Sequence, residues 1–468
     1  MRRAAWSTAA AMLAILGTAD GQTAPPVKED GYRGIWYANQ PTGDQYGYKY
    51  SGGMATYPQQ HAPIAIYAPA AEKTFFVYGG AADDDQRLLH MVSYYDHRTG
   101  RVPRPTRLLD KNTTDAHDNP TLAMDEEGYL YVFSNAHGPV RPTYIHRSRR
   151  PYSIDAFDRL PAPYFSYSQP WHLADGFLLL HTRYESGGRS LHIVTSPDAR
   201  SWTKPRLFAR MREGSYQVSW SNGRRVATAF DLHPDDAREA GLNRRTNLYY
   251  AETADEGSTW RTAAGAALDL PLRSAHNPAL VHDYQAEQRL VYLKDVTWDQ
   301  EGDQDGSPVI LFLLARDHRP GPVGGPREWQ TARWDRRAAT WQIQPVTTSD
   351  HNYDHGSLYI EPGGRWRLLA PTDPGAYPGG TGGDLVLWES RDRGATWSRI
   401  KRLTHGKRNH SYARRPLRAH PQFWALWADG NPLEPSESAL YFTDRDATHV
   451  WRLPMHMSSE TAKPEIVW

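Results

Sequence analysis

The chain has 468 residues, 39% hydrophobic and 23% charged, which is typical of a folded globular protein and not of a disordered or fibrous one. Its net charge of +1 shows no nucleic-acid-binding footprint, and the absence of cysteine excludes disulfides, thiol catalysis and zinc sites with cysteine ligands. The 37 glycines and 35 prolines favour many turns and argue against a mainly helical protein.

The first 21 residues differ from the rest of the chain. Arg2 and Arg3 precede an apolar stretch over residues 4–17, and Ala19-Asp20-Gly21 places small residues where a signal peptidase acts. The pattern predicts a secretory signal peptide over residues 1–21, with an uncleaved N-terminal anchor as the alternative. No later segment approaches the ~18 apolar residues of a membrane-spanning helix. We therefore expect a secreted or periplasmic protein with no membrane span in its mature form.

Short runs of branched and aromatic residues follow, most of them four to seven residues long and bounded by Gly, Pro, Asp or Asn. They cover residues 62–67, 74–78, 129–134, 176–181, 190–195, 226–230, 290–293, 309–314, 366–370, 385–389 and 423–427. Long amphipathic helices are hard to find after residue 28. The sequence therefore predicts an all-β fold.

The runs form a repeat in which a His or Tyr opens a first strand and a second apolar strand ends in polar residues. The seven openings are at His61, His117, Tyr167, Tyr216, His276, His355 and His410, and the intervals are 56, 50, 49, 60, 79 and 55 residues. Repeats of about this length with four strands each indicate a β-propeller. We predict one seven-bladed β-propeller over residues 46–468. The preceding segment, 22–45, contains residues 31–36, a candidate strand for closing the ring with the last blade.

An eight-residue pattern occurs twice, from Thr253 to Trp260 and from Ser390 to Trp397, and a shorter version runs from Ser196 to Trp202. It resembles the Asp-box, a hairpin turn between the two outer strands of a blade, in which Asp and Gly form the turn and Trp packs between blades. Asp-boxes occur in enzymes and in non-enzymes, so they indicate the fold and not the function.

The first two strands of a propeller blade are antiparallel, so the start of one lies beside the end of the other. This rule pairs His117 with His137, Tyr167 with Arg183, and Tyr216 with His233, and it pairs His276 with Lys294 and His355 with Asp373. Two consecutive repeats thus bring two histidines, a tyrosine and an arginine to one rim of the central cavity.

This set of residues suits the cleavage of a uronic-acid polysaccharide by β-elimination. The reaction needs a cation to neutralise the C5 carboxylate, a base to take the C5 proton and an acid to protonate the departing O4. Arg183 suits the first role because its planar guanidinium binds a carboxylate bidentately. His117, His137 and Tyr167 suit the other two roles, and the sequence leaves open which is base and which is acid. The alternatives to these catalytic roles are structural: capping or packing for the histidines, an aromatic wall at Tyr167 and a surface ion pair at Arg183.

Several motifs resemble the BNR-4 group of polysaccharide lyases, which contains seven-bladed ulvan lyases and rhamnose–glucuronate lyases. They are Gly31-Tyr-Arg-Gly-Ile-Trp-Tyr37, Asp118-Asn119-Pro120, Asn135-Ala-His137-Gly138, the Tyr-x-x-Pro strand at Tyr167, Thr182-Arg183-Tyr184 and Arg245-Thr-Asn247-Leu-Tyr249-Tyr250. The resemblance implies that His117 and His137 act at the cleavage site, Tyr167 transfers a proton and Arg183 neutralises the uronate. It also implies a sugar-binding role for Tyr249, and we expect substrate contacts from Asn119, His233, His276 and His355.

Some members of that group hold a structural metal ion partly by cysteine, and this chain has none, so we predict no metal site and no cofactor. Residues 351–355, His-Asn-Tyr-Asp-His, are the alternative metal cluster. We expect a monomeric lyase whose partner is an acidic polysaccharide, with ulvan as the first candidate, and which binds no nucleic acid. The alternatives are a lyase for gum arabic or arabinogalactan side chains, a sialidase-like glycosidase and a non-catalytic carbohydrate-binding propeller.

Overall fold

The computed structural model describes residues 27–54, 61–82, 87–185, 188–234, 243–299 and 306–468. Strands dominate these ranges, and helical structure is confined to short turns such as η1 (Pro69–Ala71), η2 (Ala116–Asp118) and η4 (Pro362–Gly364). The predicted all-β fold is confirmed. The predicted signal peptide lies outside the described residues, and none of the helices within them is long and apolar enough to cross a membrane.

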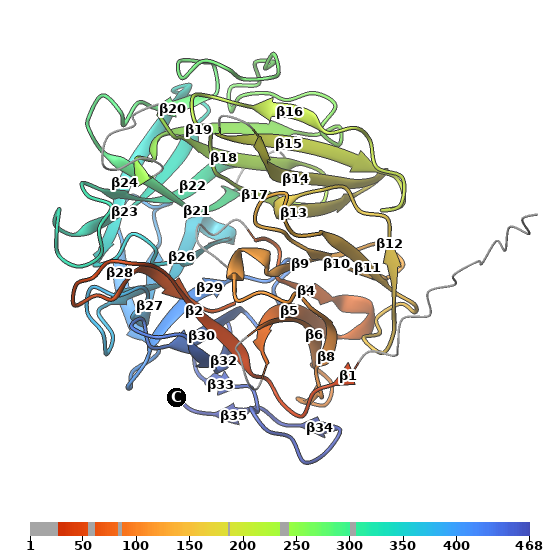
Figure 1. The fold of residues 1–468 in the computed structure, drawn as a ribbon. Coiled ribbons are helices and arrows are strands. Elements are labelled where there is room, and N and C mark those ends of the chain that lie inside the picture. Colours follow the sequence, from red (N-terminus) through yellow and green to blue (C-terminus); the bar gives the residue numbers. More distant parts are fainter. Residues whose placement is uncertain (1–26, 55–60, 83–86, 186–187, 235–242, 300–305) are drawn as a thin grey trace, which may run out of the picture.

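Six sheets, named blades 1 to 6 here, follow one another in a propeller-like ring (Figure 1). Blade 1 contains β9 (Pro120–Met124), β10 (Leu130–Ser134), β11 (Tyr144–Ser148) and β12 (Phe157–Leu160), and blade 2 contains β13 (Ser166–Leu173), β14 (Gly176–Glu185), β15 (Gly188–Ser196) and β16 (Arg206–Ala209). Blade 3 contains β17 (Gln217–Ser221), β18 (Val226–Leu232), β19 (Thr246–Thr253) and β20 (Leu280–His282), and blade 4 contains β21 (Leu290–Asp299), β22 (Ser307–Ala315), β23 (Arg327–Asp335) and β24 (Thr340–Ser349). Blade 5 contains β25 (Ser357–Glu361), β26 (Arg365–Asp373), β27 (Asp384–Ser390) and β28 (Ser398–Arg402), and blade 6 contains β29 (Asn409–Arg414), β30 (Ala425–Gly430), β32 (Leu440–Thr443), β33 (Val450–Arg452) and β35 (Glu465–Ile466).

An eight-stranded N-terminal sheet lies between the two ends of this series. Its strands are β1 (Val27–Lys28), β2 (Gly34–Pro41), β3 (Tyr48–Gly52), β4 (Ala65–Ala68), β5 (Lys73–Ala81), β6 (Leu88–Asp96), β8 (Thr106–Asp110) and β31 (Ser436–Ser438). Strand β2 pairs with β5 on one side and with β31, from the C-terminal part of the chain, on the other. A second link joins β34 (Thr461–Ala462) to β7 (Val102–Pro103). Both chain ends are therefore held in the same region of the molecule.

Three similar turns follow the third strand of a blade. After β19, Asp255 Oδ1 accepts a hydrogen bond from the Thr259 amide at 2.9 Å, and the Gly257 amide donates to Thr253 Oγ1 at 2.9 Å. The turn after β27 has the same bonds, and in the turn after β15 Asp198 accepts from two backbone amides at 2.8 Å. The tryptophan that ends the first turn is 1% exposed. The turn after β19 thus ties the edge of blade 3 to buried aromatic packing.

The fifth predicted repeat opening is wrong. His276 lies in the long connection between β19 and β20 of blade 3, and the next first strand, β21, begins at Leu290. That connection lengthens the repeat, which explains the uneven intervals of 60 and 79 residues. Lys294 lies within β21 and therefore does not end a second strand, as the pairing rule assumed.

Replacing Gly394 by Ala should destabilise the fold more than the same change at Gly265. Both glycines have a left-handed backbone, with φ of +83° and +84°, so both variants carry similar backbone strain. Only at Gly394 would the added Cβ meet a packed side chain, 2.6 Å from Trp366 Cζ3, whereas Gly265 faces open space. We expect the Gly394 variant to lose about 1–3 kcal/mol more than the Gly265 variant in urea denaturation. Equal losses would contradict this packing role.

Candidate active site

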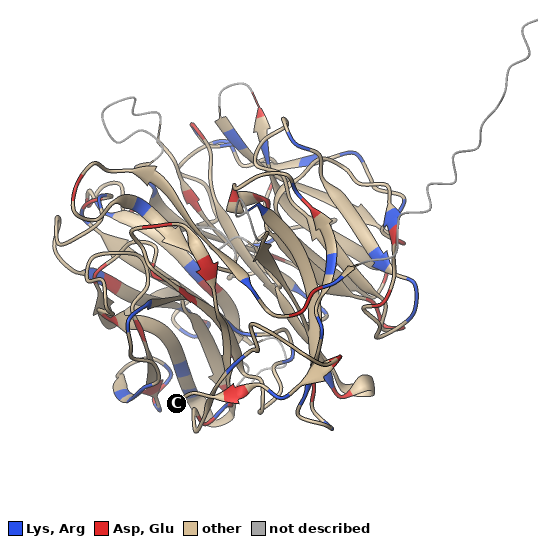
Figure 2. Ribbon diagram, turned by 60° about the horizontal axis from the view of Figure 1, so that its bottom comes forward, with Lys and Arg blue, Asp and Glu red and all other residues tan. Residues whose placement is uncertain are grey.

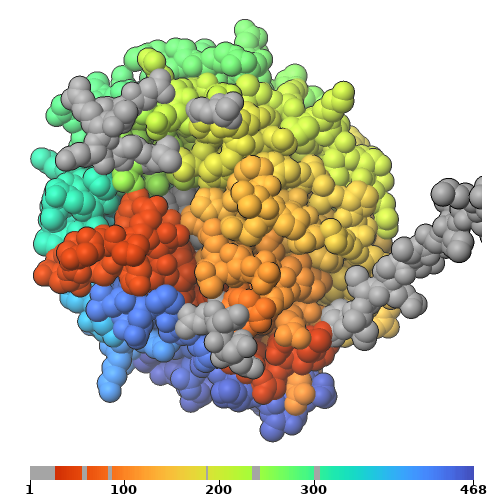
Figure 3. Space-filling view, in the orientation of Figure 1, coloured from red at the N-terminus to blue at the C-terminus, as the bar shows by residue number. Residues whose placement is uncertain are grey.

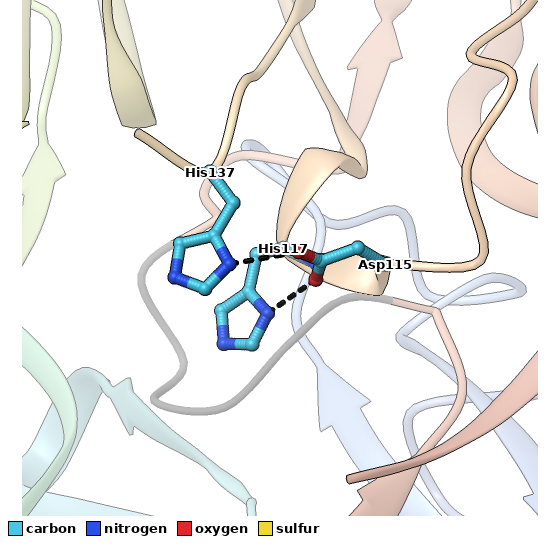
Figure 4. A group of neighbouring side chains, drawn as sticks. All are labelled: Asp115, His117 and His137. Atoms are coloured by element: carbon cyan, nitrogen blue, oxygen red, sulfur yellow. Dashed lines mark hydrogen bonds and ion pairs between the residues drawn. The ribbon is translucent and has the colours of Figure 1, made fainter. Parts of the chain in front are cut away.

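The site is built around one carboxylate, Asp115, which caps the short turn η2. Its Oδ1 accepts from the His117 amide at 3.0 Å and from His117 Nδ1 at 2.5 Å, while Oδ2 accepts from His137 Nδ1 at 2.7 Å. Figure 4 shows the two imidazoles side by side against this carboxylate, and their rings stack with centroids 4.0 Å apart. The predicted pairing of His117 with His137 is therefore present.

A second carboxylate and two cations hold this group in place. Arg141 bonds to Asp115 Oδ2 at 2.7 Å and to both oxygens of Asp118, at 2.7 and 2.9 Å. Lys111 Nζ lies 3.3 Å from Asp118, which also accepts the His137 amide at 2.7 Å. Burial by itself raises the pKa of Asp115, but the hydrogen bonds and charges of the two histidines outweigh it and hold that pKa below its usual range. Asp115 is therefore ionised.

An ionised Asp115 accepts only, so each imidazole that bonds to it carries its proton on Nδ1. The Nε2 atoms of His117 and His137 then present lone pairs, and in Figure 4 both point away from the carboxylate. Burial lowers the pKa of His117, although Asp115 opposes the shift. The His137 side chain is 33% exposed, whereas His117 is buried and its Nε2 lies 3.3 Å from the Tyr50 hydroxyl. The pair thus offers a base with one accessible member.

Tyr167 lies beside this pair, at an irregularity in the pairing of β13 with β14. Its backbone is left-handed, with φ of +52°, which costs a non-glycine residue roughly 1–2 kcal/mol. Its ring centroid is 5.9 Å from that of His117, and its hydroxyl lies 2.7 Å from the Tyr184 hydroxyl. Burial, with Tyr184 and Tyr216 nearby, raises the pKa of Tyr167 well above its usual value. Tyr167 is therefore a neutral phenol.

Around Tyr167 runs a closed series of neighbouring side chains, which we call the aromatic–basic circuit. It consists, in order, of His117, Tyr50, Lys49, Tyr353, Arg245, Tyr216, Arg189, Tyr184 and His137. Lys49 and Tyr50 come from β3, and Figure 3 shows red N-terminal residues next to the orange residues that follow them in the chain. The N-terminal segment and the blades therefore both contribute residues to the site.

The cations of the circuit alternate with tyrosine rings. Arg189 Cζ lies 5.4 Å from the ring centroid of Tyr184 and 5.0 Å from that of Tyr216, and Arg245 Cζ lies 4.8 Å from the latter. Within the part of the chain that the structure describes, no salt bridge to Asp or Glu is found for Lys49 or Arg189. Figure 2 shows acidic and basic residues scattered over the rest of the fold, in keeping with the net charge of +1. Positive charge is therefore gathered locally, as an anionic ligand requires.

Residues 79–349 match the family model described as BNR repeat-containing family member. The chain belongs to the BNR repeat-containing family. Curated relatives include an ulvan lyase of polysaccharide lyase family 25 from Pseudoalteromonas sp. (strain PLSV), 22% identical over 305 residues, which are 56% of this chain and 60% of that protein. Ulvan lyases from Alteromonas sp. (strain LOR) and Nonlabens ulvanivorans are each 24% identical, over 59% and 60% of this chain and 62% and 66% of their own lengths.

This BNR family member thus spans less than two thirds of the length of those curated relatives. Among solved structures, a family 25 ulvan lyase superimposes with a TM-score of 0.69 at 18% identity, over 90% of this chain and 96% of the other. A second structure of such an enzyme, described as bound to -[GlcA(1-4)Rha3S]-, gives a TM-score of 0.69 at 17% identity, over 90% and 96% of the two chains. These likenesses show a shared fold.

Arg183 lies next to the circuit and is not one of its members. Its Nε lies 3.7 Å from Glu185 and its Cζ 5.3 Å from the Tyr164 ring, on the outer side of the circuit residue Tyr184. Arg189, which the sequence analysis missed, pairs across the β14–β15 hairpin with Tyr184 and thus reaches the circuit. The Ser-Gly-Gly run before Arg189 is a turn signal that predicts this pairing.

Five predicted substrate-binding residues lie outside the circuit. The buried Asn119 donates to the Ala116 carbonyl at 2.9 Å, so it supports η2 from within. Tyr249 stacks in the core and donates to a backbone carbonyl, and His233 is fully buried behind Tyr216. His355 is 2% exposed, and the His276 side chain is 76% exposed and lies 3.2 Å from Asp283 on the surface.

Asp115, His117 and His137 also have the residue types of a metal site, and their ligand atoms lie within 4.8 Å of one another. Within the described ranges, it is the one such group found, and it does not include residues 351–355. However, both Nδ1 atoms are engaged by Asp115, and Arg141 occupies the same carboxylate. A cation already neutralises the group, so its arrangement suits proton transfer better than metal binding.

Replacing Asp115 by Asn should lower the pKa of the His117 imidazole further, because the Asp115 hydrogen bond and charge now raise it against burial. This change in pKa is measured by following the chemical shifts of the imidazole nitrogens by NMR as the pH is varied. Asp158→Asn, on the outer strand of the same blade, is the control, since Asp158 pairs only with the exposed Arg149 among the described residues. An unchanged His117 pKa in the Asp115 variant would contradict the proposed orientation.

Proposed function

We propose that this BNR family member is a polysaccharide lyase that cleaves a uronic-acid-containing polysaccharide by β-elimination, with ulvan as its first substrate. The observation that carries the proposal is that an imidazole pair and an arginine with no acidic partner among the described residues surround a protonated tyrosine. β-Elimination needs these three functions together, namely a base, an acid and a cation.

Arg189 is the residue that we assign to the uronate carboxylate. Its Nε and Nη1 atoms are buried and find no hydrogen-bond partner among the residues that the structure describes. A buried guanidinium in this state is costly unless a ligand completes its hydrogen bonds. A carboxylate does so bidentately, and neutralising it makes the C5 proton more acidic and stabilises the enolate that forms.

His137 is the base in this proposal, and His117 supports it. The Nε2 of His137 is the accessible lone pair, and stacking against His117 and bonding to Asp115 fix its direction. It takes the C5 proton, the electrons of that bond form the C4–C5 double bond, and the C4–O4 bond breaks. Asp115 stabilises the imidazolium that results, as a carboxylate does in other base–carboxylate pairs.

Tyr167 is the acid that protonates the departing O4. Its raised pKa keeps the hydroxyl protonated, and its bond to Tyr184 gives a path for a proton to return from solvent, since Tyr184 is only half-buried. The proton held by the histidine is lost to solvent, so the enzyme returns to its starting state. The products are a 4,5-unsaturated uronate end and a free hydroxyl on the other sugar, with no net redox change.

The relatives support a uronate substrate. Three curated relatives are ulvan lyases, and one solved structure of the same fold is described as bound to a glucuronate-containing repeat. A sialidase-like glycosidase would release a reducing sugar without a double bond, and a binding propeller would give no product. Product analysis separates the three functions.

Around this activity we propose the larger organisation that the sequence suggested. The N-terminal sheet acts as a seventh blade, β2 closes the ring against β31, and the turns after β15, β19 and β27 are Asp-boxes. Residues 1–21 direct secretion or export to the periplasm. The protein works as a monomer and requires no cofactor, because residues of this chain supply every proton and charge of the reaction.

Ulvan incubated with the purified protein should yield products that absorb in the ultraviolet, because β-elimination creates a double bond conjugated with the carboxylate. A panel that also contains gum arabic and glucuronan defines the substrate. If the folded protein releases no ultraviolet-absorbing product from any of these polysaccharides, the proposed function is overturned.

Arg189→Gln should reduce kcat by at least about a hundredfold, because the variant loses the cation that stabilises the enolate. Arg183→Gln is the matched control on the same hairpin and should retain activity within a few fold. Tyr167→Phe should also be nearly inactive while the fold survives. If Arg183→Gln is inactive and Arg189→Gln is active, the assignment of the carboxylate-binding residue is reversed.

A further inference from the structure

Lys49 is a buried lysine that the proposed chemistry does not use. It is 7% exposed, and its Nζ lies 3.1 Å from Gln40 Oε1 and also bonds to Asn243 Oδ1. Both partners are neutral amide oxygens, and no salt bridge to Asp or Glu is found for Lys49 within the described ranges. A buried ammonium in these surroundings needs a compensating negative charge.

The place of Lys49 in the circuit shows where that charge would come from. Arg189 and Lys49 are separated along the circuit by Tyr216, Arg245 and Tyr353, with successive distances of 5.0, 4.8, 5.6 and 6.0 Å between cation and ring centroid. Arg189 contacts the rings of Tyr184 and Tyr216 and Lys49 those of Tyr50 and Tyr353, so the two residues share no ring and each offers its own position for an anion. The tyrosine rings between them form an apolar wall on which a sugar ring can pack.

We infer that Lys49, with Arg245 beside it, binds a second anionic group of the same polysaccharide chain, one located on a sugar next to the uronate held by Arg189. The inference rests on the proposed function and adds a determinant of specificity to it. A sulfate ester and the carboxylate of a further uronate share the required chemistry, because both offer several anionic oxygens to ammonium and guanidinium donors.

The electrostatics of Lys49 agree with this role. Burial and the charges of Arg245 and Arg189 lower the pKa of Lys49 to about 6, so near pH 7 it is mainly a neutral amine. A neutral amine has two N–H donors, and Gln40 and Asn243 accept them. An arriving anion favours the charged form and raises the pKa, so Lys49 takes up a proton and gains a third donor.

This coupling fixes the sign of the pH dependence. The pKa of Lys49 is higher with the anion bound than without it, so binding of a doubly anionic substrate weakens as pH rises through the bound value. The titratable or charged groups around Lys49 are Arg189, Arg245, His318, His351, Tyr50 and Tyr353.

The test uses the full-length protein, Lys49→Met, and the control Lys204→Met, whose side chain is exposed far from this circuit on the outer side of blade 2. Three oligosaccharides serve as probes. One carries a single uronate and no sulfate, one carries the same uronate with a sulfate on the neighbouring sugar, and one carries two uronates without sulfate. KM and kcat are measured with each, and calorimetry in two buffers of different ionisation enthalpy counts the protons taken up on binding.

Lys49→Met should raise KM on a doubly anionic probe about tenfold or more relative to KM on the singly anionic probe, the scale of one charge-assisted hydrogen bond. Proton uptake on binding should disappear. An effect on the sulfated probe identifies a sulfate subsite, and an effect on the two-uronate probe identifies a carboxylate subsite.

Equal effects of Lys49→Met on all three probes, or no effect on any, would overturn the inference and leave the proposed function standing. If the unmodified protein turns over none of the probes, the proposed function is overturned instead. In that case, calorimetry still decides the inference, because loss of discrimination between singly and doubly anionic probes in Lys49→Met supports it and unchanged discrimination overturns it.

Discussion

The active geometry depends on one carboxylate shared by two imidazoles. Because Asp115 bonds to the Nδ1 atoms of both His117 and His137, a single ionised group fixes both tautomers and both ring directions. Arg141 and the buried Asp118 hold Asp115 itself, so the group is rigid before any ligand arrives. Preorganisation of this kind removes the need to reorient groups during reaction, which is where most enzymatic stabilisation of charge originates.

The distribution of charge in the molecule favours the same site. The chain as a whole is almost neutral, yet Lys49, Arg189 and Arg245 all contact tyrosine rings of the one circuit around Tyr167. Concentrating cations on an aromatic wall in this way attracts a polyanion to one place without making the whole surface basic. It also lowers the pKa of Lys49, so that the charge of the site responds to the ligand.

Much of this arrangement follows from the chain order of the strands. The antiparallel pairing of first and second strands brings His117 beside His137 and Tyr216 beside His233, as the repeat predicted. The rule failed at His276, because a long connection within blade 3 imitates a repeat interval. The same rule pointed to Arg183, whereas Arg189 joins the circuit through its pairing with Tyr184 across the β14–β15 hairpin, which residue type alone does not reveal.

The sequence by itself determined the all-β class, the recurrence of the blades and the histidine pair, because hydrophobic alternation and turn residues act over a few positions. The tertiary structure alone decided that Lys49 and Tyr50 of the N-terminal segment join the same circuit as Arg189 and Arg245. These residues lie up to about two hundred positions apart, and only closure of the sheets around a common centre brings their charges within reach of one ligand. Burial and mutual repulsion, which set the chemistry of Lys49, exist only after that closure.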